Sequence, residues 1–363
     1  MIKIFYTILA FNANHFYINV IYAFIAILIV LFLIITVYSI YYQKRERNQK
    51  RWEGTVTDLI NEVIFLDDEE AFPELLAQQN KLLKSAHYRQ FLIDEIIKTK
   101  KLLSGTSAIG LKKLYEQLQL DQHSFSKLSS YSWQKKAKGV QELSAMEQSQ
   151  YVKKIFRLTT NKNETVRNQA QCGLVSYYGF KGLRFLNVTI YPISEWQQIQ
   201  LLSNLSIAIP QNTAMMKRWL QSPMESVVVF SLKLACFYND FTVYEDVANC
   251  LAHSSTKVKL FALDYLKKIP TEETAEVMIR EYKKGDKRFR LAVIDALKYM
   301  GSTDDVNFLL GELDDVDNDV KAAAAKAIMF IHPAGNDFLQ TLSYASILPW
   351  KTIFKQVNNE VAA

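Results

Sequence analysis

The chain has 363 residues, of which 49% are apolar and 22% are charged, and this balance excludes a mostly disordered protein. Only 11 glycines and 7 prolines occur in this length, which argues against a β-rich fold with many turns. The three cysteines, Cys172, Cys236 and Cys250, are odd in number and show no Cys-x-x-Cys spacing. We therefore expect buried, reduced thiols in a cytosolic compartment.

The net charge of +6 is unevenly distributed. Residues 53–80 carry eight acidic and no basic side chains, whereas residues 81–154 carry fourteen basic and six acidic ones. Residues 302–320 carry seven acidic side chains and no Lys or Arg. Two interpretations of the first two blocks remain open, because neighbouring blocks of opposite charge can neutralise each other by packing or can face charged partners.

The first predicted element is a transmembrane helix over residues 16–42. Residues 4–43 contain no Asp, Glu, Lys or Arg, and tyrosines lie near both ends of the predicted helix. About 20 apolar residues are enough to cross the hydrocarbon core of a bilayer, and aromatic residues are common at its two surfaces. Residues 1–15 then form a short extracytoplasmic segment, which has no small-x-small cleavage site of a signal peptide.

Flanking charge predicts the orientation of this helix. A single Lys precedes it, and five basic residues follow it: Lys44, Arg45, Arg47, Lys50 and Arg51. Because Lys and Arg flanks stay in the cytoplasm, the N-terminus is predicted outside and the rest of the chain inside. The same five side chains are the candidates for contact with anionic lipid headgroups.

Residues 43–85 are expected to form a basic juxtamembrane segment and a helical neck or cap. Their apolar residues have helical spacing from Thr55 onward, and the acidic run Asp67–Glu70 is predicted to be a loop or a helix N-terminus. Residues 86–345 are predicted to form an α-solenoid, with the clearest pattern over 133–345. Residues 346–363 are expected to be a C-terminal cap or tail.

The solenoid prediction is based on a regular repeat along the chain. Residues 286–316 contain an amphipathic helix from Phe289 to Met300, a Gly-Ser-Thr turn, and a second helix from Asp304 to Leu313. Apolar residues recur at one constant step in the first helices at Trp196, Val227, Val258, Phe289 and Val320, and in the second helices at Met216, Val247, Met278 and Leu309 and at Leu220, Leu251, Tyr282 and Leu313. A period of this length is typical of helix pairs that bury their apolar stripes against neighbouring pairs.

Small residues and glycines refine this pattern. A small residue follows several first-helix anchors by four positions, at Ala137, Ala170, Ser231, Ala262 and Ala324. One helical turn past the anchor, we expect two helices to approach closely at these sites. Gly179 and Gly301 follow first helices, where a left-handed residue commonly ends a helix.

The pattern resembles the HEAT-repeat family, whose short bacterial versions carry Asp or Asn, Val-Arg, Ala, Ala-Leu and Gly in this order. The matching residues include Asp319-Val320-Lys321, Ala324 and Ala327-Ile328. The resemblance covers residues 130–345 well and 86–130 loosely. The unit at Trp196 departs most, because it lacks the small residue and has Pro192 and Pro210 around it, so we expect this unit to be bent or shifted by one residue. It implies an all-α fold: an N-terminal transmembrane helix followed by an α-α superhelical HEAT-like solenoid.

The layout is also similar to bacterial single-span HEAT proteins that accompany membrane glycosyltransferases. This similarity implies a place in the bacterial inner membrane. It also implies a partner that is a membrane enzyme for envelope or exported polysaccharide.

No motif of a catalytic, cofactor or metal site is present, so we predict an enzyme function, a cofactor and a metal site to be absent. The aspartates between Asp304 and Asp319 lack the glycine and twelfth-position glutamate of a calcium-binding loop, and we expect them to cap helices. The basic loop 283–290 lies one repeat earlier. We expect it to form ion pairs with the acidic loop at Asp314–Asp319, and the alternative is a docking ridge for a charged partner.

The sequence therefore predicts a membrane-anchored cytoplasmic scaffold that binds a protein partner. The candidate protein-binding residues are outward-facing positions of the second helices: Lys217, Arg218, Glu245, Asp246, Glu276 and Arg280. Two alternatives are a hydrolase or lyase with a pocket in the concave groove, near Trp219 or Tyr244, and a regulator that acts on anionic lipid surfaces. A nucleic-acid partner is not expected, because the basic excess lies next to the anchor in sequence.

Overall fold

The structure, a computed structural model, describes residues 2–65, 79–206 and 212–332, with side chains from Tyr22 onward, and scattered positions between 335 and 357. Every element in this part of the chain is an α-helix or a 3-10 helix, which confirms the all-α prediction. The chain divides into two compact units, residues 1–126 and residues 127–363. The predicted start of the solenoid at residue 86 thus falls inside the first unit.

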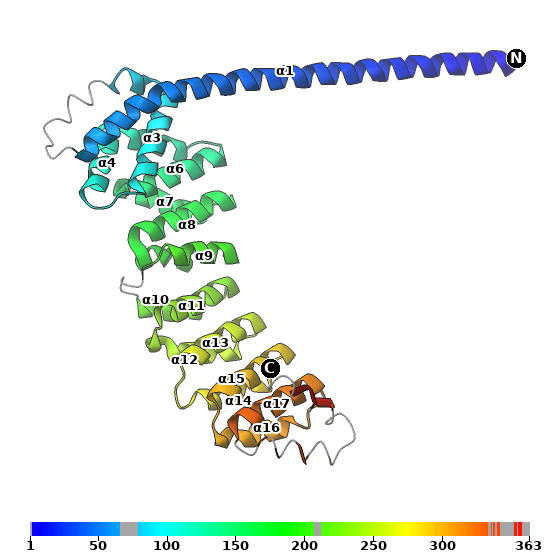
Figure 1. Cartoon of the computed structure of the whole chain (residues 1–363), viewed down its shortest axis with the longest axis vertical. Coiled ribbons are helices and arrows are strands. Elements are labelled where there is room, and N and C mark those ends of the chain that lie inside the picture. The colour runs from blue at the N-terminus through cyan, green and yellow to red at the C-terminus, as the bar shows by residue number, and fades with distance from the viewer. Residues whose placement is uncertain are drawn as a thin grey trace. The chain divides into compact units, whose positions relative to one another are not determined.

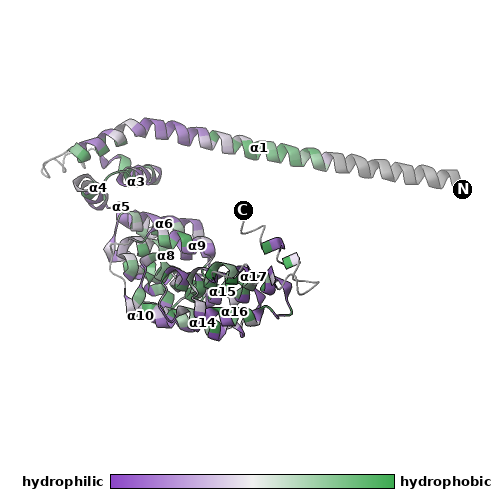
Figure 2. Ribbon diagram, turned by 60° about the horizontal axis from the view of Figure 1, so that its bottom comes forward, coloured by the Kyte–Doolittle hydropathy of each residue, from purple (hydrophilic) through white to green (hydrophobic). Residues whose placement is uncertain are grey.

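The first unit begins with α1, a single helix that runs from Ile2 to Phe65. From Tyr22 on it is long and apolar enough to cross a membrane, and none of its apolar window is buried by the rest of the chain. Figure 2 shows this stretch in green, followed by a hydrophilic stretch in purple. Length and composition suit a membrane span, and near an N-terminus they also suit a signal sequence. The predicted acidic loop Asp67–Glu70 lies outside the described residues, as does part of the acidic block.

The C-terminal part of α1 belongs to a small core. It packs against α3 (Ala86–Lys100) and α4 (Thr106–Gln117), which are followed by α5 (Leu120–Leu128). The 3-10 turn η2 (Leu82–Lys84) precedes α3, and the Ser85 side chain caps α3 by accepting a hydrogen bond from the Tyr88 backbone N–H at 3.4 Å. The buried apolar side chains of this core include Val56, Leu59, Ile60, Val63, Leu92, Ile93, Ile96, Leu111 and Leu114.

The second unit is a stack of helix pairs, seen as successive layers from α6 to α17 in Figure 1. Its first helices are α6 (Trp133–Ala145), α8 (Glu164–Tyr178), α9 (Glu195–Ser203), α11 (Glu225–Tyr238), α13 (Thr256–Lys268), α15 (Lys287–Met300) and α17 (Asn318–Ile331). Their first residues are evenly spaced along the sequence, except that the step from Glu195 to Glu225 is shorter than the others by one. The period found in the sequence is therefore the repeat of the structure.

The second element of each pair is shorter and more varied. These elements are η3 (Ser149–Tyr151) with α7 (Val152–Leu158), η4 (Gly179–Asn187), α10 (Thr213–Leu220), η5 (Phe241–Val243) with α12 (Tyr244–Asn249) and η6 (Cys250–Ala252), α14 (Thr274–Tyr282), and η7 (Thr303–Asp305) with α16 (Val306–Glu312). The helices α10, α14 and α16 each contact the first helix of the next pair. Each layer thereby covers the apolar stripe of its neighbour.

Burial confirms the register of the repeat. The predicted first-helix anchors Val227, Val258, Phe289 and Val320 and the second-helix anchors Met216, Val247, Met278, Leu309, Leu220, Leu251, Tyr282 and Leu313 are all buried. The predicted small residues Ala137, Ala170, Ser231, Ala262 and Ala324 are buried as well. Since removing apolar surface from water contributes roughly 25 cal/mol per Å², this continuous core is the main stabilising term of the unit.

Two positions of the predicted repeat are wrong. Trp196 is not a buried anchor but 66% exposed, and Gln197 occupies the buried position, because the step from α9 to α11 is one residue short. This is the one-residue shift expected as an alternative for this unit. The buried Gln197 amide donates a hydrogen bond to the Gln171 side chain, so a polar contact replaces an apolar one. Gly179 has the expected positive φ of 55°, but Gly301 has a φ of −68° and leads directly into the capping turn η7.

Replacing Ala170 by leucine tests the close approach of first helices. Ala170 is fully buried on α8, which packs tightly against α6, so the added volume forces these helices apart. We expect Ala170→Leu to lower the free energy of unfolding by about 1–3 kcal/mol. The control Thr165→Leu adds a leucine at an exposed position of the same helix and should change it little. Thermal unfolding of the full chain in detergent measures both, and equal effects would contradict the packing described.

Candidate interaction surface

The second helices of the middle repeats present one charged surface. The six predicted residues lie on α10 (Lys217, Arg218), α12 (Glu245, Asp246) and α14 (Glu276, Arg280). All are exposed except Asp246, which is half-buried, and the buried anchors of the same helices point into the core. Each helix thus divides into an apolar inner stripe and a charged outer one.

The register of the repeat aligns these charges from layer to layer. Glu245 and Glu276 are one period apart in sequence, and Arg218 and Arg280 are two periods apart. These two pairs carry the same charge at equivalent positions, but Asn249 lies between Arg218 and Arg280, and the residues one period after Lys217 and Asp246 are Ala248 and Val277. The surface therefore presents charges of both signs over three layers, rather than a single pocket.

Polar contacts hold the second helices against one another. The Lys217 ammonium lies 3.3 Å from the Asp246 carboxylate and joins α10 to α12. The Tyr244 hydroxyl lies 2.7 Å from the Thr274 hydroxyl and joins α12 to α14. The Lys217 side chain is 47% exposed and that of Asp246 16%, so solvent screens the pair and Lys217 is its more accessible partner. Such a pair stabilises the fold by about 1 kcal/mol or less.

The aromatic side chains that a catalytic groove would need here have structural roles. Trp219 is only 1% exposed, and its indole N–H donates a hydrogen bond to the Asn187 side chain at 2.8 Å. Tyr244 is half-buried and bonded to Thr274. Among the residues that the structure describes, no group of three or more His, Cys, Asp or Glu side chains is placed to hold a metal ion.

The basic loop 283–290 and the acidic residues of the following repeat form ion pairs, as predicted, and we call this set of contacts the ion-pair ladder. The Lys287 ammonium lies 2.7 Å from Asp317 and 2.5 Å from Asp319. The Arg290 guanidinium donates to Glu312 at 2.9 Å and also to Asp315. Lys287 and Arg290 thus pair with the acidic loop as predicted, whereas Lys284 pairs with Glu281 of its own repeat. Lys283 and Arg288 are exposed, so the alternative of a docking ridge stays open for these two residues.

Deeper in the same ladder the contacts are more enclosed. Glu312 is only 8% exposed, and it also accepts a hydrogen bond from the buried Tyr282 hydroxyl at 2.7 Å. Burial is the main cause that raises the pKa of Tyr282, and the hydrogen bond to Glu312 is the second. Charge-assisted hydrogen bonds in such surroundings are stronger than those at the surface, so this network fastens α16 to α14 and α15.

The predicted caps are confirmed as well. The Asp286 side chain accepts from the Phe289 backbone N–H at 2.9 Å, and Asp317 accepts from Asp319 N–H at 2.9 Å. The Asp317 backbone N–H and then the Arg290 guanidinium hold the pKa of Asp315 below its usual range. Asp305, Asp315, Asp317 and Asp319 are therefore explained by caps and ion pairs of the fold, whereas Asp304 and Asp314 are exposed beside them.

The five basic residues that follow the apolar stretch are all exposed on α1. Lys50 lies 3.0 Å from Glu46 on the same helix, one turn away. Lys44 and Arg45 line a pocket that also includes Trp52 of α1 and His87 of α3. The sequence reasoning missed this pocket. The only signal for it was the helical spacing of polar and aromatic residues after the apolar stretch.

The repeats match a known family. The sequence model of a family described as HEAT repeats matches residues 245–329, a range that covers α12 to α17. Within this range the chain is similar to HEAT repeats. HEAT repeats generally act as scaffolds for protein interactions through extended surfaces such as the one described above. Among curated proteins, no sequence matches that of this chain.

Two solved structures are similar to these HEAT repeats in outline. One is the crystal structure of an engineered protein, with 14% identity, coverage of 85% of this chain and 99% of that chain, and a TM-score of 0.33. The other comes from work on tubulin recruitment by microtubule polymerases with tumor overexpressed gene domain arrays. It has 13% identity, coverage of 81% of this chain and 82% of that chain, and a TM-score of 0.25. At these TM-scores neither likeness bears on the function of this chain.

Replacing Asp315 by asparagine tests the ion-pair ladder. The variant loses a charge-assisted hydrogen bond to Arg290, so we expect the free energy of unfolding at pH 7 to fall by about 1–2 kcal/mol. The lowered pKa of Asp315 means that its contribution is fully present above the unfolded pKa, about 3.9, and is lost as pH falls through the folded pKa. The difference in the free energy of unfolding between the wild type and Asp315→Asn should therefore disappear in acid.

The matched control is Asp314→Asn, at the exposed neighbouring position. It removes the same charge without removing a ladder contact, so it should leave stability and its pH dependence almost unchanged. Thermal unfolding of the three proteins at pH 7 and in acid gives the comparison. Identical behaviour of the two variants would show that the ladder does not stabilise the repeats.

Proposed function

We propose that this chain is a membrane-anchored scaffold whose second-helix surface binds a protein partner. The observation that carries the proposal is the exposed charged surface of α10, α12 and α14, which lies over a continuous buried core. A rigid core fixes the spacing of the outer charges, so a partner with complementary charges at that spacing is favoured over others.

The proposed anchor is the apolar stretch of α1. Its exposed apolar side chains from Tyr22 to Tyr42 would be unfavourable in water and favourable in a bilayer. The basic residues that follow it favour a topology with the N-terminus outside and the repeats in the cytoplasm. The resemblance to bacterial single-span proteins implies that this membrane is the inner membrane of a bacterial cell.

An anchored scaffold favours partners in the same membrane. Confinement to one surface raises the effective concentration of the two proteins, so even modest contacts suffice for binding. We propose a membrane enzyme as the partner, with a glycosyltransferase of envelope or exported polysaccharide as the class that the sequence resemblance implies.

The proposal assigns no catalytic step to this chain. Trp219 and Tyr244 are the aromatic residues named for the alternative catalytic groove. Both side chains make hydrogen bonds that hold the fold. The charged residues beside them are exposed on the outer surface of the second helices. This arrangement supports recognition of a protein surface over enclosure of a substrate.

A charge-reversed variant of the surface tests this function. The variant Lys217→Glu/Arg218→Glu/Glu245→Lys/Asp246→Lys keeps the net charge and inverts the ion pair between α10 and α12. In-cell crosslinking of the full chain followed by mass spectrometry should identify one dominant membrane protein. Its yield should fall at least about tenfold in the variant, because like charges then face the partner.

The control inverts an ion pair on the first helices. Lys267 and Asp295 lie 3.6 Å apart on α13 and α15, and Lys267→Glu/Asp295→Lys also keeps the net charge. The partner yield should match that of the wild type. Equal yields in all three proteins, or crosslinks only within the chain itself, would contradict the proposed surface.

A further inference from the structure

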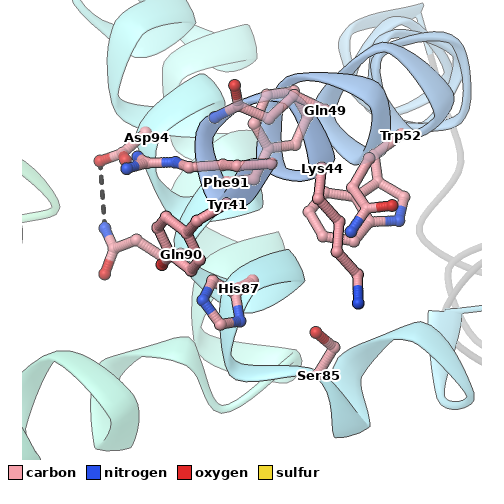
Figure 3. A pocket seen from close by; sticks show the side chains of 11 residues that line it. Tyr41, Lys44, Gln49, Trp52, Ser85, His87, Gln90, Phe91 and Asp94 are labelled. Carbon is pink, nitrogen blue, oxygen red and sulfur yellow. Dashed lines mark hydrogen bonds between the residues drawn. The ribbon is translucent and has the colours of Figure 1, made fainter. Parts of the chain in front are cut away.

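A pocket of about 350 Å³ lies between α1 and the start of α3 within the first unit (Figure 3). Figure 3 shows Lys44 and Trp52 of α1 and His87 and Phe91 of α3 on facing sides of this pocket. Its volume falls within the range of small-molecule sites, about 300–1,000 Å³. The contacts of the repeats and their surface do not involve it.

The pocket is formed by one stripe of each helix. On α1 the lining residues Tyr41, Lys44, Arg45, Asn48 and Trp52 follow one another at helical spacing. On α3 the lining residues His87, Gln90, Phe91 and Asp94 do the same. Residues spaced by three or four positions share a helix face, so two whole faces are turned toward each other here.

Exposure falls along the α1 stripe. Tyr41, Lys44 and Arg45 are exposed, whereas Asn48 and Trp52 are half-buried. The Trp52 ring packs edge-on against Tyr88 at 5.4 Å between ring centroids and also contacts Phe91 at 6.0 Å. The pocket therefore has an aromatic base held by ring contacts and a rim that carries cations.

The charges favour an anion. Lys44 and Arg45 contribute two cations, and His87 adds a side chain that can donate a hydrogen bond. The remaining ionisable lining residue is Asp94, which accepts a hydrogen bond from Gln90 at 3.1 Å. The fixed charge of the lining is thus positive by one.

Position on α1 points to the source of the anion. Tyr41 and Tyr42 end the exposed apolar stretch, and the cations of the pocket follow within one turn. At 1.5 Å per residue, the eleven steps from Tyr41 to Trp52 span about 16 Å, enough to pass through the headgroup layer of one leaflet. If α1 spans the membrane, the rim of the pocket lies at the depth of lipid phosphates.

We propose that this pocket binds an anionic phospholipid, with its headgroup phosphate between Lys44 and Arg45 and its glycerol region against Tyr41, Trp52 and Phe91. The inference rests on the proposed anchoring of α1. A bound lipid would fill the space between α1 and α3 and fix the direction in which the anchor leaves the first unit. The site differs from general attraction to the basic stretch, because Arg47, Lys50 and Arg51 do not line the pocket.

The test titrates the full chain in nonionic detergent with phosphatidylglycerol and counts bound lipids by native mass spectrometry. Lys44→Gln/Arg45→Gln removes both cations of the pocket, and the control Arg47→Gln/Arg51→Gln removes two charges from the same helix outside it. We expect the pocket variant to raise the dissociation constant about 30-fold, since each well-placed cation contributes on the order of 1 kcal/mol. The control should raise it less than about threefold.

A second variant keeps the charges and fills the space. Asn48→Phe places a ring at a half-buried position of the lining and should also abolish tight binding of one phosphatidylglycerol. Phosphatidylcholine and inorganic phosphate are the comparison ligands. Weak binding of both is expected, and inorganic phosphate that binds as tightly as phosphatidylglycerol would overturn the assignment to a lipid.

Two further results would overturn the inference. An equal loss of phosphatidylglycerol affinity in the two charge variants would mean that lipid binding follows charge alone. Unchanged affinity in both would mean that the pocket is not the binding site. Incorporation of the wild type into phosphatidylcholine nanodiscs reports separately on the anchor. If the chain stays outside the nanodiscs, both the anchoring and the lipid assignment are wrong. If the chain is incorporated but Lys44→Gln/Arg45→Gln leaves phosphatidylglycerol binding unchanged, only the assignment to the pocket is wrong.

Discussion

Burial of one apolar stripe per helix, at a constant step along the chain, is the constraint on which the second unit depends. No pair of helices covers its own stripe, so each layer is stable only against its neighbours. The same step that brings Val258 and Phe289 to equivalent buried positions brings Glu245 and Glu276 to equivalent exposed ones. The core thus determines the spacing of the exposed positions on the outer surface, and the proposed recognition depends on that spacing.

Polar contacts occur where the repeat is irregular or must be fastened. The one short step, between α9 and α11, coincides with the buried amides of Gln171 and Gln197, which bond to each other in place of apolar packing. In the last repeats, Arg290 joins Glu312 and Asp315, and the buried Tyr282 hydroxyl completes the network. These contacts specify local geometry, while the apolar core provides most of the free energy.

The fold of the repeats could be predicted from the sequence because one period recurs across several units, and the buried anchors from Val227 to Val320 follow it. The ion-pair ladder could be predicted for the same reason, since equivalent loops of successive repeats are neighbours. The irregularity of the Trp196 unit could be predicted from its missing small residue, but the sequence left open whether the unit is bent or shifted, which only the stacking of the helices decides. The pocket in the first unit was missed because the facing of α1 and α3 depends on packing outside any repeat.

Alkaline carbonate extraction of cells that express the full chain would show whether α1 anchors the repeats in a membrane, as we propose. Carbonate strips peripheral proteins and leaves those with a spanning helix in the pellet. We expect the chain to stay in the membrane pellet, and Ile29→Arg/Leu33→Arg, within the exposed apolar stretch, to release it. If the unaltered chain were released into the soluble fraction, α1 would not be a membrane anchor.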